Sequence, residues 1–380
     1  MSSLVLIRNA ELFDPTPQGR KDVLLGGGKV LRIGERLENY SGADVIDADG
    51  AVLAPGFVDS LVHISGGGGE GGFATRTAAL SDANEAFRAG ITTVVGALGT
   101  DDITRSLADL LACARGLTEQ GLSAFTLTGS YQFPVTTLTG NVRSDLVLIP
   151  DAIGVGEIAI ADHRGSHPTI DELARLGSQA RVGGMLAGKP GTVLVHVGDA
   201  PEGLSILHAV SDRHPLPASQ WHPTHINRNA GLLDQAPAWV ARGGSIDITT
   251  STTPDLLAAG DIPAPTALQQ LVARGVPVSR ISMSSDGQAS LPHYNASGAL
   301  LAIEVAPIRS LHEAVVAAVL DLGLPLTDVL TTVTRTPAGI WGLRNKGEIR
   351  VNADADMVLL DPGSLRVRMT IAHGHVHRYD

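Results

Sequence analysis

The sequence predicts an α/β fold, a (β/α)8 TIM-like barrel with a small β-sandwich domain built from both chain termini. Three observations lead to this prediction. Eight short apolar runs alternate with helical patterns through the middle of the chain. Four of these runs end in a residue that can bind metal, as the strands of such barrels do. Both ends of the chain are instead rich in short strand-like segments separated by turns.

The two ends are expected to join in one domain. Strands are predicted at 4–7, 22–25, 29–34, 45–47, 51–54, 347–351, 356–360 and 365–371. The pair Asp49-Gly50 predicts a hairpin between the fourth and fifth of these strands. Neither end alone has enough apolar surface for a core. We therefore expect a small β-domain from residues 1–55 and 344–380 and a barrel from residues 56–343.

The middle of the chain supplies the barrel. Its apolar runs are 56–59, 91–98, 122–128, 153–161, 192–197, 222–226, 245–249 and 281–285. Helical patterns such as 82–88 and 171–181 separate them, which predicts parallel strands with crossover helices. Eight runs favour a closed barrel over an open sheet. Helices over 312–322 and 326–334, separated by Pro325, are expected to close it.

Composition and charge exclude several classes of function. The formal net charge of −11 argues against broad binding of nucleic acid or anionic membrane, which needs a basic surface. The single cysteine, Cys113, cannot form an internal disulfide, and its apolar helical surroundings predict a buried, inert thiol. The N-terminus shows no basic segment followed by a long apolar stretch, so a cytoplasmic protein is expected.

Four of the apolar runs predicted for the barrel end in a residue of a type that can bind metal. Glu157, His196, His225 and Asp286 arrive in this order along the chain. Two nitrogen and two oxygen ligands on separate strands suit a zinc-type site, and Asp286 beside it could move protons. A lone strand-end histidine is more often a hydrogen-bonded core residue, and an aspartate there can cap a turn. Four together favour a metal-dependent hydrolase.

The remaining histidines are expected near turns, at the surface or away from strand ends. They include His167, His214, His222, His293, His312, His373, His375 and His377.

Three charged residues predict the substrate. Glu70 follows four glycines, where it is suited to binding a cationic amine. Arg164 and Arg228 each follow a strand end, where guanidinium groups could bind carboxylates. The expected partner is therefore a small, dipeptide-like, dianionic substrate. A solvent loop for Glu70 and salt bridges for the arginines are the plainer alternatives.

Several motifs resemble the isoaspartyl dipeptidase family of the amidohydrolase superfamily. They are Ser65-Gly66-Gly67-Gly68-Gly69-Glu70, Leu127-Thr128-Gly129-Ser130-Tyr131, Asp162-His163-Arg164, Arg181-Val182-Gly183-Gly184, Pro223-Thr224-His225-Ile226-Asn227-Arg228-Asn229 and Ser284-Ser285-Asp286-Gly287. The resemblance covers nearly the whole chain. It implies a barrel with a small β-domain from both termini, zinc, a homo-oligomer and cleavage of β-aspartyl peptide bonds.

The resemblance also implies roles for individual residues. The metal would be bound by His63, His196 and His225, with Asp286 as the catalytic aspartate and metal neighbour. The oxyanion would be stabilised by Tyr131. The substrate amine would be held by Glu70, and the rest of the substrate would be bound by Arg164, Arg228 and Ser290.

The sequence departs from the family pattern at two positions. Leu61 stands where the first histidine of His-x-His is expected, and Glu157 replaces the bridging carboxylated lysine, with Gly156 as an extra residue before it. Glu157, His196 and His225 still make three ligands, the number typical of a catalytic zinc. We therefore expect one zinc per chain, with a second, weaker site as an alternative.

The leading hypothesis is zinc-dependent hydrolysis of β-aspartyl dipeptides or a closely related amide. A hydantoinase- or dihydroorotase-like hydrolase of cyclic amides is the second, since one fold supports many substrates. The third is a catalytically degenerate barrel that only binds a ligand, which Leu61 would explain.

Overall fold

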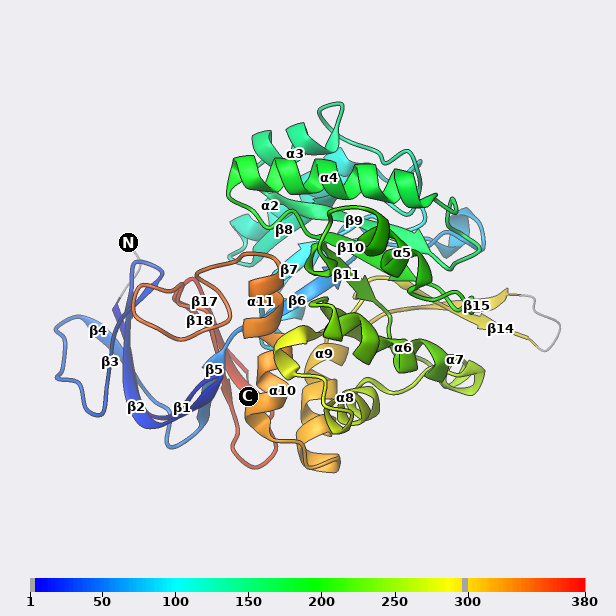
Figure 1. The fold of residues 1–380 in the computed structure, drawn as a ribbon. Coiled ribbons are helices and arrows are strands. Elements are labelled where there is room, and N and C mark those ends of the chain that lie inside the picture. The colour runs from blue at the N-terminus through cyan, green and yellow to red at the C-terminus, as the bar shows by residue number, and fades with distance from the viewer. Residues whose placement is uncertain (1–3, 296–299, 380) are drawn as a thin grey trace.

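The computed structural model describes residues 4–295 and 300–379, and it has two parts. One is a barrel of parallel strands enclosed by helices, and the other is a mixed sheet from both ends of the chain (Figure 1). This arrangement confirms the predicted fold class. The domain boundaries at residues 55 and 344 stay a prediction.

The terminal sheet has eight strands in the order β18-β17-β16-β5-β1-β2-β3, with β4 paired to β1. They are β1 (Leu4–Asp14), β2 (Thr16–Gly26), β3 (Lys29–Gly34), β4 (Ala43–Asp47), β5 (Val52–Pro55), β16 (Met357–Leu360), β17 (Val367–Ala372) and β18 (His375–Arg378). Antiparallel pairing of β5 with β16 joins the two ends of the chain. Backbone hydrogen bonds from the β2–β3 hairpin to residues 352–355 curl the sheet around its own apolar core.

The predicted hairpin at Asp49-Gly50 is wrong. Strands β4 and β5, on either side of this turn, both pair in parallel with β1 and not with each other. Strand β1 is 11 residues long, so its first half accommodates β4 and its second half β5. Asp49 and Gly50 both have positive φ, and the turn moves the chain along one edge of β1. A turn dipeptide fixes the local backbone but not the partner of the next strand.

The barrel strands follow the eight predicted runs closely. They are β6 (Phe57–Val62), β7 (Ile91–Gly96), β8 (Ser123–Thr128), β9 (Ala152–Ile160), β10 (Val193–Val197), β11 (Trp221–Thr224), β12 (Ile246–Thr249) and β13 (Ile281–Ser284). Sheet pairing runs from β6 to β11, and β12 pairs with β13. The ring closes where Ile226 N donates to Asp247 O at 3.2 Å and where Val62 bridges Gly287 in parallel.

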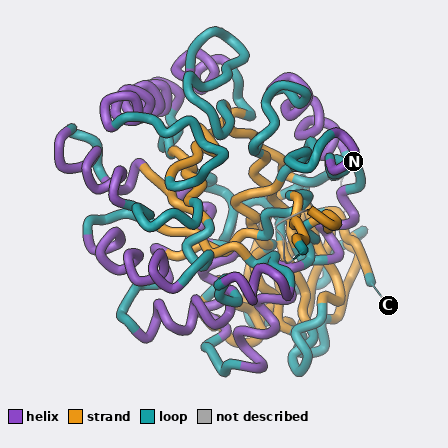
Figure 2. The backbone as a smooth tube through the Cα atoms, turned by 90° about the vertical axis from the view of Figure 1, so that its right-hand side faces the viewer, coloured by secondary structure: helices purple, strands orange, loops and turns teal. Residues whose placement is uncertain are grey.

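Helices surround the strands, as Figure 2 shows for the view turned by 90°. They are α1 (Ala83–Arg88), α2 (Leu107–Glu119), α3 (Val142–Leu148), α4 (Ile170–Ala187), α5 (Ser205–Arg213), α6 (Ala230–Ala241), α7 (Pro254–Ala259), α8 (Ala264–Ala273), α9 (Ser310–Val316), α10 (Leu326–Val333) and α11 (Arg335–Ile340). A π-helical turn, Ala317–Asp321, continues α9. The hairpin of β14 (Ser290–Tyr294) and β15 (Leu300–Val305) extends from the barrel on the right of Figure 1.

Burial explains why the barrel strands read as continuous apolar runs. All nine residues of β9 are buried, as are all six of β6 and β7, because helices cover one face and the barrel interior the other. Helix α4, which follows β9, begins at a capping box of Thr169 and Glu172 and ends at Gly188 with a φ of 69°. Within residues 4–295 and 300–379, no helix combines the length and apolar character needed to cross a membrane.

Candidate metal centre and substrate cavity

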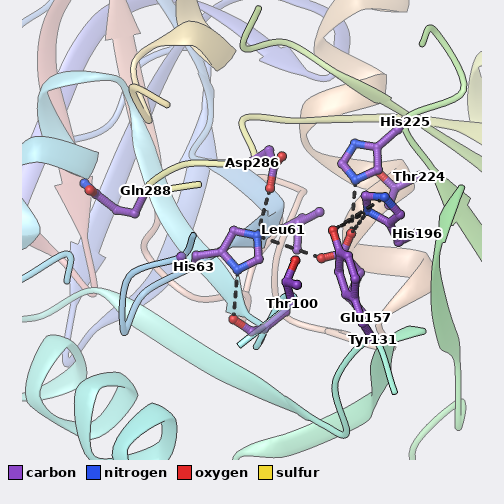
Figure 3. Close-up of polar contacts among 12 residues, drawn as sticks. Leu61, His63, Thr100, Tyr131, Glu157, His196, Thr224, His225, Asp286 and Gln288 are labelled. Carbon is purple, nitrogen blue, oxygen red and sulfur yellow. Dashed lines mark hydrogen bonds and ion pairs between the residues drawn. The ribbon is translucent and has the colours of Figure 1, made fainter. Parts of the chain in front are cut away.

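The carboxyl ends of the barrel strands surround a cavity of 630 Å³. Nine of the predicted site residues line it: His63, Glu70, Tyr131, Arg164, His196, His225, Arg228, Asp286 and Ser290. The tenth, Glu157, is wholly buried and contacts three of them, as Figure 3 shows. The structure thus brings all ten residues together, and their chemical roles stay predictions.

Three buried side chains form a group that could hold a metal ion. Glu157 Oε1 lies 2.9 Å from His196 Nδ1 and 3.0 Å from His225 Nε2 (Figure 3). One ligand atom from each residue lies within 4.8 Å of the other two. They come from three consecutive strands: Glu157 lies within β9 (Ala152–Ile160), His196 is the last residue but one of β10, and His225 directly follows β11 with a φ of 62°.

Glu157 reaches this group through an irregularity in β9. Val155 pairs with Val193 and Ile158 with Val195, so β9 has one residue more than β10 between these pairs. A bulge of this kind re-aims a side chain. Gly156 allows it, because a Cβ atom there would lie 2.8 Å from Leu194 Cβ. The extra glycine expected from the sequence therefore lies where the strand bulges.

The donor atoms fit a cation. His196 has a carboxylate at each ring nitrogen, with Asp162 Oδ2 2.8 Å from Nε2 and Glu157 at Nδ1. A neutral imidazole carries one N–H, so one of these contacts lacks a proton. Glu157 Oε2 is also buried without a hydrogen-bond partner in the described part of the chain. A zinc ion between Glu157, His196 and His225 would satisfy these lone pairs.

The protonation states agree with metal binding. Burial raises the pKa of Glu157, but hydrogen bonds from His196 and His225 outweigh it and hold the pKa below its ordinary value. Burial lowers the pKa of His225 to about 4. At neutral pH, Glu157 is therefore anionic and His225 neutral, which are the forms that bind metal.

His63 and Asp286 face each other on the opposite side of the site. His63 Nε2 lies 3.1 Å from Asp286 Oδ1 and 3.8 Å from Glu157 Oε2. His63 Nδ1 lies 3.2 Å from Ala97 O, so it donates there. Burial lowers the pKa of His63, but the contact with Asp286 outweighs it and raises the pKa to about 9.

Leu61 lies inside the barrel and cannot bind metal. It is wholly buried and packs with six apolar residues, namely Val95, Ala97, Leu127, Ile153, Leu194 and Trp341. His63 is therefore the one histidine of the expected pair, with Asp286 and Glu157 Oε2 as its acidic neighbours. A second metal at this position would have fewer nitrogen ligands than the first.

Tyr131 contacts the same histidine as Glu157. Its hydroxyl group lies 2.6 Å from His196 Nδ1, and the two rings are 4.4 Å apart between centroids. The guanidinium carbon of Arg164 lies over the Tyr131 ring, 5.5 Å from its centroid. Burial raises the pKa of Tyr131 well above its ordinary value, so the hydroxyl group keeps its proton and can donate it in a hydrogen bond.

Glu70 is held at the rim of the cavity by three side chains. Thr100 Oγ1 and Ser290 Oγ donate to its two oxygens at 2.9 and 3.1 Å, and Arg164 Nη1 lies 3.3 Å from Oε1. Glu70, Thr100 and Arg164 lie in three different loops and Ser290 begins β14, so the four residues are separated by up to 220 residues in the sequence. A negative and a positive group therefore lie side by side in the lining of the cavity.

Asp162 is a site residue for which we predicted no role of its own. It directly follows β9, is 3 % exposed and accepts hydrogen bonds from His196 Nε2 and Arg164 Nη2, both at 2.8 Å. Arg228 Nη1 lies 3.7 Å from the same oxygen. Burial raises the pKa of Asp162, but the hydrogen bonds from His196 and Arg164 outweigh it and lower the pKa well below its ordinary value.

A model of the amidohydrolase family matches residues 52–376 of the chain. This chain belongs to the amidohydrolase family. The matched stretch contains every predicted site residue, from His63 to Ser290.

One solved relative is similar to this amidohydrolase over its full length. It is the β-aspartyl dipeptidase of the thermophilic, keratin-degrading Fervidobacterium islandicum AW-1, solved in complex with a β-Asp-Leu dipeptide. The two chains are 39 % identical and superimpose with a TM-score of 0.93, covering 100 % of this chain and 97 % of that one. The dihydropyrimidinase of Brevibacillus agri NCHU1002 is 18 % identical over 98 % of this chain and 94 % of its own, with a TM-score of 0.64, and shows the fold alone.

Dihydroorotases match this amidohydrolase over shorter stretches. The enzyme of Clostridioides difficile is 34 % identical over 102 residues, which are 26 % of this chain and 23 % of that protein. The enzyme of Clostridium acetobutylicum is 28 % identical over 109 residues, or 28 % and 25 %. The match thus spans about a quarter of the length of these curated relatives.

Two further residues support the site without a signal in the sequence. Thr249, at the end of β12, has its hydroxyl oxygen 2.5 Å from His225 Nδ1. Thr100 fixes Glu70, as described above. Neither residue belongs to one of the motifs named above. A threonine that orients another side chain can be identified only from the contact between the two. Asp162 did carry a signal, its place in Asp162-His163-Arg164.

His222 lies away from the carboxyl end of its strand, inside the barrel. It lies on β11, is wholly buried and has Ser245 Oγ 2.9 Å from Nδ1 and Ser282 Oγ 3.0 Å from Nε2. Burial lowers its pKa to about 3, so it is a neutral core histidine below the cavity. Its position next to a strand start gave no indication of the serines that enclose it.

Proposed function

We propose that this amidohydrolase hydrolyses β-aspartyl (isoaspartyl) dipeptides with the help of one zinc ion. One observation carries the proposal. The cavity beside the candidate metal group is lined by the carboxylate of Glu70 and by two guanidinium groups, Arg164 and Arg228. A β-aspartyl dipeptide has one free amine and two carboxylates, which match these three charges.

Glu157, His196 and His225 would hold the zinc. Bound there, zinc would polarise the substrate carbonyl and lower the pKa of a water molecule. We expect one tightly held ion, because Leu61 removes a ligand from the position beside His63 and Asp286. A second, weaker ion at that position is the alternative.

Asp286 would move the protons. Its side chain lies at the end of β13 within 3.1 Å of His63, which limits the directions in which the carboxylate can point. We propose that it accepts a proton as the water attacks and delivers it to the leaving amine. Tyr131, which keeps its proton, would donate a hydrogen bond to the developing oxyanion.

Specificity would come from the charged rim. Glu70 would pair with the α-amino group, with Ser290 beside it, and the two arginines would pair with the carboxylates. In the structure without substrate, Arg164 is paired with Glu70 and Asp162. A zwitterionic substrate can replace the pair of Arg164 and Glu70 by one amine and one carboxylate without leaving either charge unpaired.

Zinc-loaded protein should cleave β-Asp-Leu in preference to α-Asp-Leu and dihydroorotate. The assay follows release of free leucine from the two dipeptides and ring opening of dihydroorotate at equal concentrations. A sample that holds zinc and ignores β-Asp-Leu would refute the proposal. The homo-oligomer and the cytoplasmic location stay predictions.

The short matches to dihydroorotases support a cyclic amide as the second candidate substrate. A cyclic amide has no free amine, so Glu70 would have no cationic partner. Glu70→Gln separates the two hypotheses, because it should weaken hydrolysis of a dipeptide but leave hydrolysis of a cyclic amide unchanged. Inactivity toward both substrates would favour a barrel that only binds a ligand.

A further inference from the structure

Asp162 lies between the candidate metal ligands and the candidate substrate-binding arginines. Its Oδ2 accepts from His196 Nε2 and from Arg164 Nη2, both at 2.8 Å. Its Oδ1 accepts from Arg164 N at 2.8 Å and from Arg164 Nε at 3.0 Å. Arg228 Nη1 lies 3.7 Å from Oδ2 and 3.4 Å from His196 Nε2. One carboxylate therefore contacts two guanidinium groups and an imidazole.

The contact between Asp162 and His196 bears on the tautomer that binds metal. Both side chains are buried, with Asp162 3 % and His196 2 % exposed. Ionised carboxylates only accept hydrogen bonds, and Asp162 and Glu157 each face one ring nitrogen, so a neutral ring can donate to only one of them. When Nδ1 binds metal beside Glu157, the hydrogen atom is on Nε2, where Asp162 accepts it. Nδ1 is then left with its lone pair, and it faces Glu157 and the hydroxyl group of Tyr131. This is the nitrogen of His196 that lies 2.9 Å from Glu157 Oε1 in the candidate metal group.

The backbone around Asp162 is shaped to bring the carboxylate this close. Ala161 has a φ of 50°, which turns the chain directly after β9. Gly198 follows β10, and a Cβ atom there would lie 2.6 Å from both Cα and Cβ of Asp162. Any larger residue at Gly198 would displace Asp162 from His196. The contact is thus built by two neighbouring strand ends and not by one flexible side chain.

We propose that Asp162 is a positioning residue that holds His196 in its metal-binding tautomer and fixes Arg164 and Arg228 beside it. The role of the arginines rests on the proposed function, whereas the role toward His196 does not. Hydrogen bonds of this kind to a metal-binding histidine fix its orientation and raise its basicity. Occupancy of the metal site and binding of a substrate carboxylate would then both depend on one side chain.

A simple salt bridge is the competing interpretation. In that case Asp162 would serve only Arg164, and its removal would impair substrate binding or folding without changing metal affinity. The two interpretations differ in zinc affinity measured without substrate, so the test does not require that the protein be a dipeptidase.

The experiment measures the Kd for zinc by competition with a coloured chelator, for full-length wild type and three variants. Asp162→Ala should weaken zinc binding by about 10–100-fold, the usual effect of removing such a partner. Asp171→Asn is the matched control, because Asp171 also pairs with a histidine, His214 at 3.2 Å, but on the surface. It should leave the Kd unchanged.

Asp162→Asn provides a variant of the same size in case the alanine variant does not fold. Its amide cannot accept from both His196 and the three donors of Arg164, so zinc binding should weaken here as well. Thermal unfolding of each metal-free variant reports on folding. A folded Asp162→Asn or Asp162→Ala protein with wild-type zinc affinity would overturn the proposal. Weakened zinc binding in a protein that ignores β-Asp-Leu would uphold it for His196 and refute only the proposed substrate.

Discussion

Replacing Asp286 by asparagine tests the proposed proton transfer most directly. Asparagine has nearly the same shape and keeps one carbonyl oxygen beside His63, but it cannot take a proton from water. The side chain is only 14 % exposed, so bulk water has limited room to take over the transfer. Loss of a positioned acid–base group costs about two to four orders of magnitude in rate. At about 1.36 kcal/mol for each factor of ten, this is about 2.7–5.4 kcal/mol of activation free energy.

The assay is steady-state hydrolysis of β-Asp-Leu, with kcat and KM determined separately. We expect the loss in kcat, because Asp286 would act on the reacting atoms and not on the substrate charges that Glu70 and the arginines bind. Zinc content and thermal stability serve as controls, since a variant that lost its metal would also be slow. An Asp286→Asn protein that retains zinc and turns over within about tenfold of wild type would refute acid–base catalysis by Asp286.

Three further predictions follow from the same geometry. Purified protein should hold about one zinc per chain, and Glu157→Ala should release most of it; two tightly held ions by elemental analysis would contradict the role given to Leu61. Arg228→Met should lower kcat/KM for β-Asp-Leu by a factor that corresponds to about 2–4 kcal/mol of lost transition-state stabilisation, and an unchanged kcat/KM would exclude a carboxylate contact. His222, with its pKa lowered from 6.5 to about 3, stays neutral in the folded protein while the unfolded chain binds a proton, so its contribution to stability is lost as pH falls from 6.5 toward 3. In denaturant titrations over this pH window, the free energy of unfolding of His222→Gln should fall less steeply than that of wild type, by about 1.4 kcal/mol per pH unit. Equal pH dependence of the two proteins would contradict this prediction.

The barrel could be predicted from the sequence because its strands are buried on both faces. Such strands appear as continuous apolar runs, and the run at 281–285 became β13, Ile281–Ser284. Strand-end residues could be predicted for the same reason, since parallel strands place their carboxyl ends at one mouth. His196 and His225 meet for this reason. Glu157, which is 68 residues from His225 in the sequence, joins them from the bulge inside β9, and the three ligand atoms lie within 4.8 Å of one another.

The sequence did not determine which side chains pair. The partner of β4 depends on the length of β1, and the environment of His222 depends on Ser245, just before β12, and on Ser282 of β13. The motif Asp162-His163-Arg164 marked Asp162, but its contact with His196 is visible only where the ends of β9 and β10 lie side by side and Gly198 leaves room for it. Local preferences and hydrophobic periodicity act over a few residues, so they determine the elements and their ends. Hydrogen bonds between distant loops depend on distances of a few ångström, and only the assembled barrel decides those.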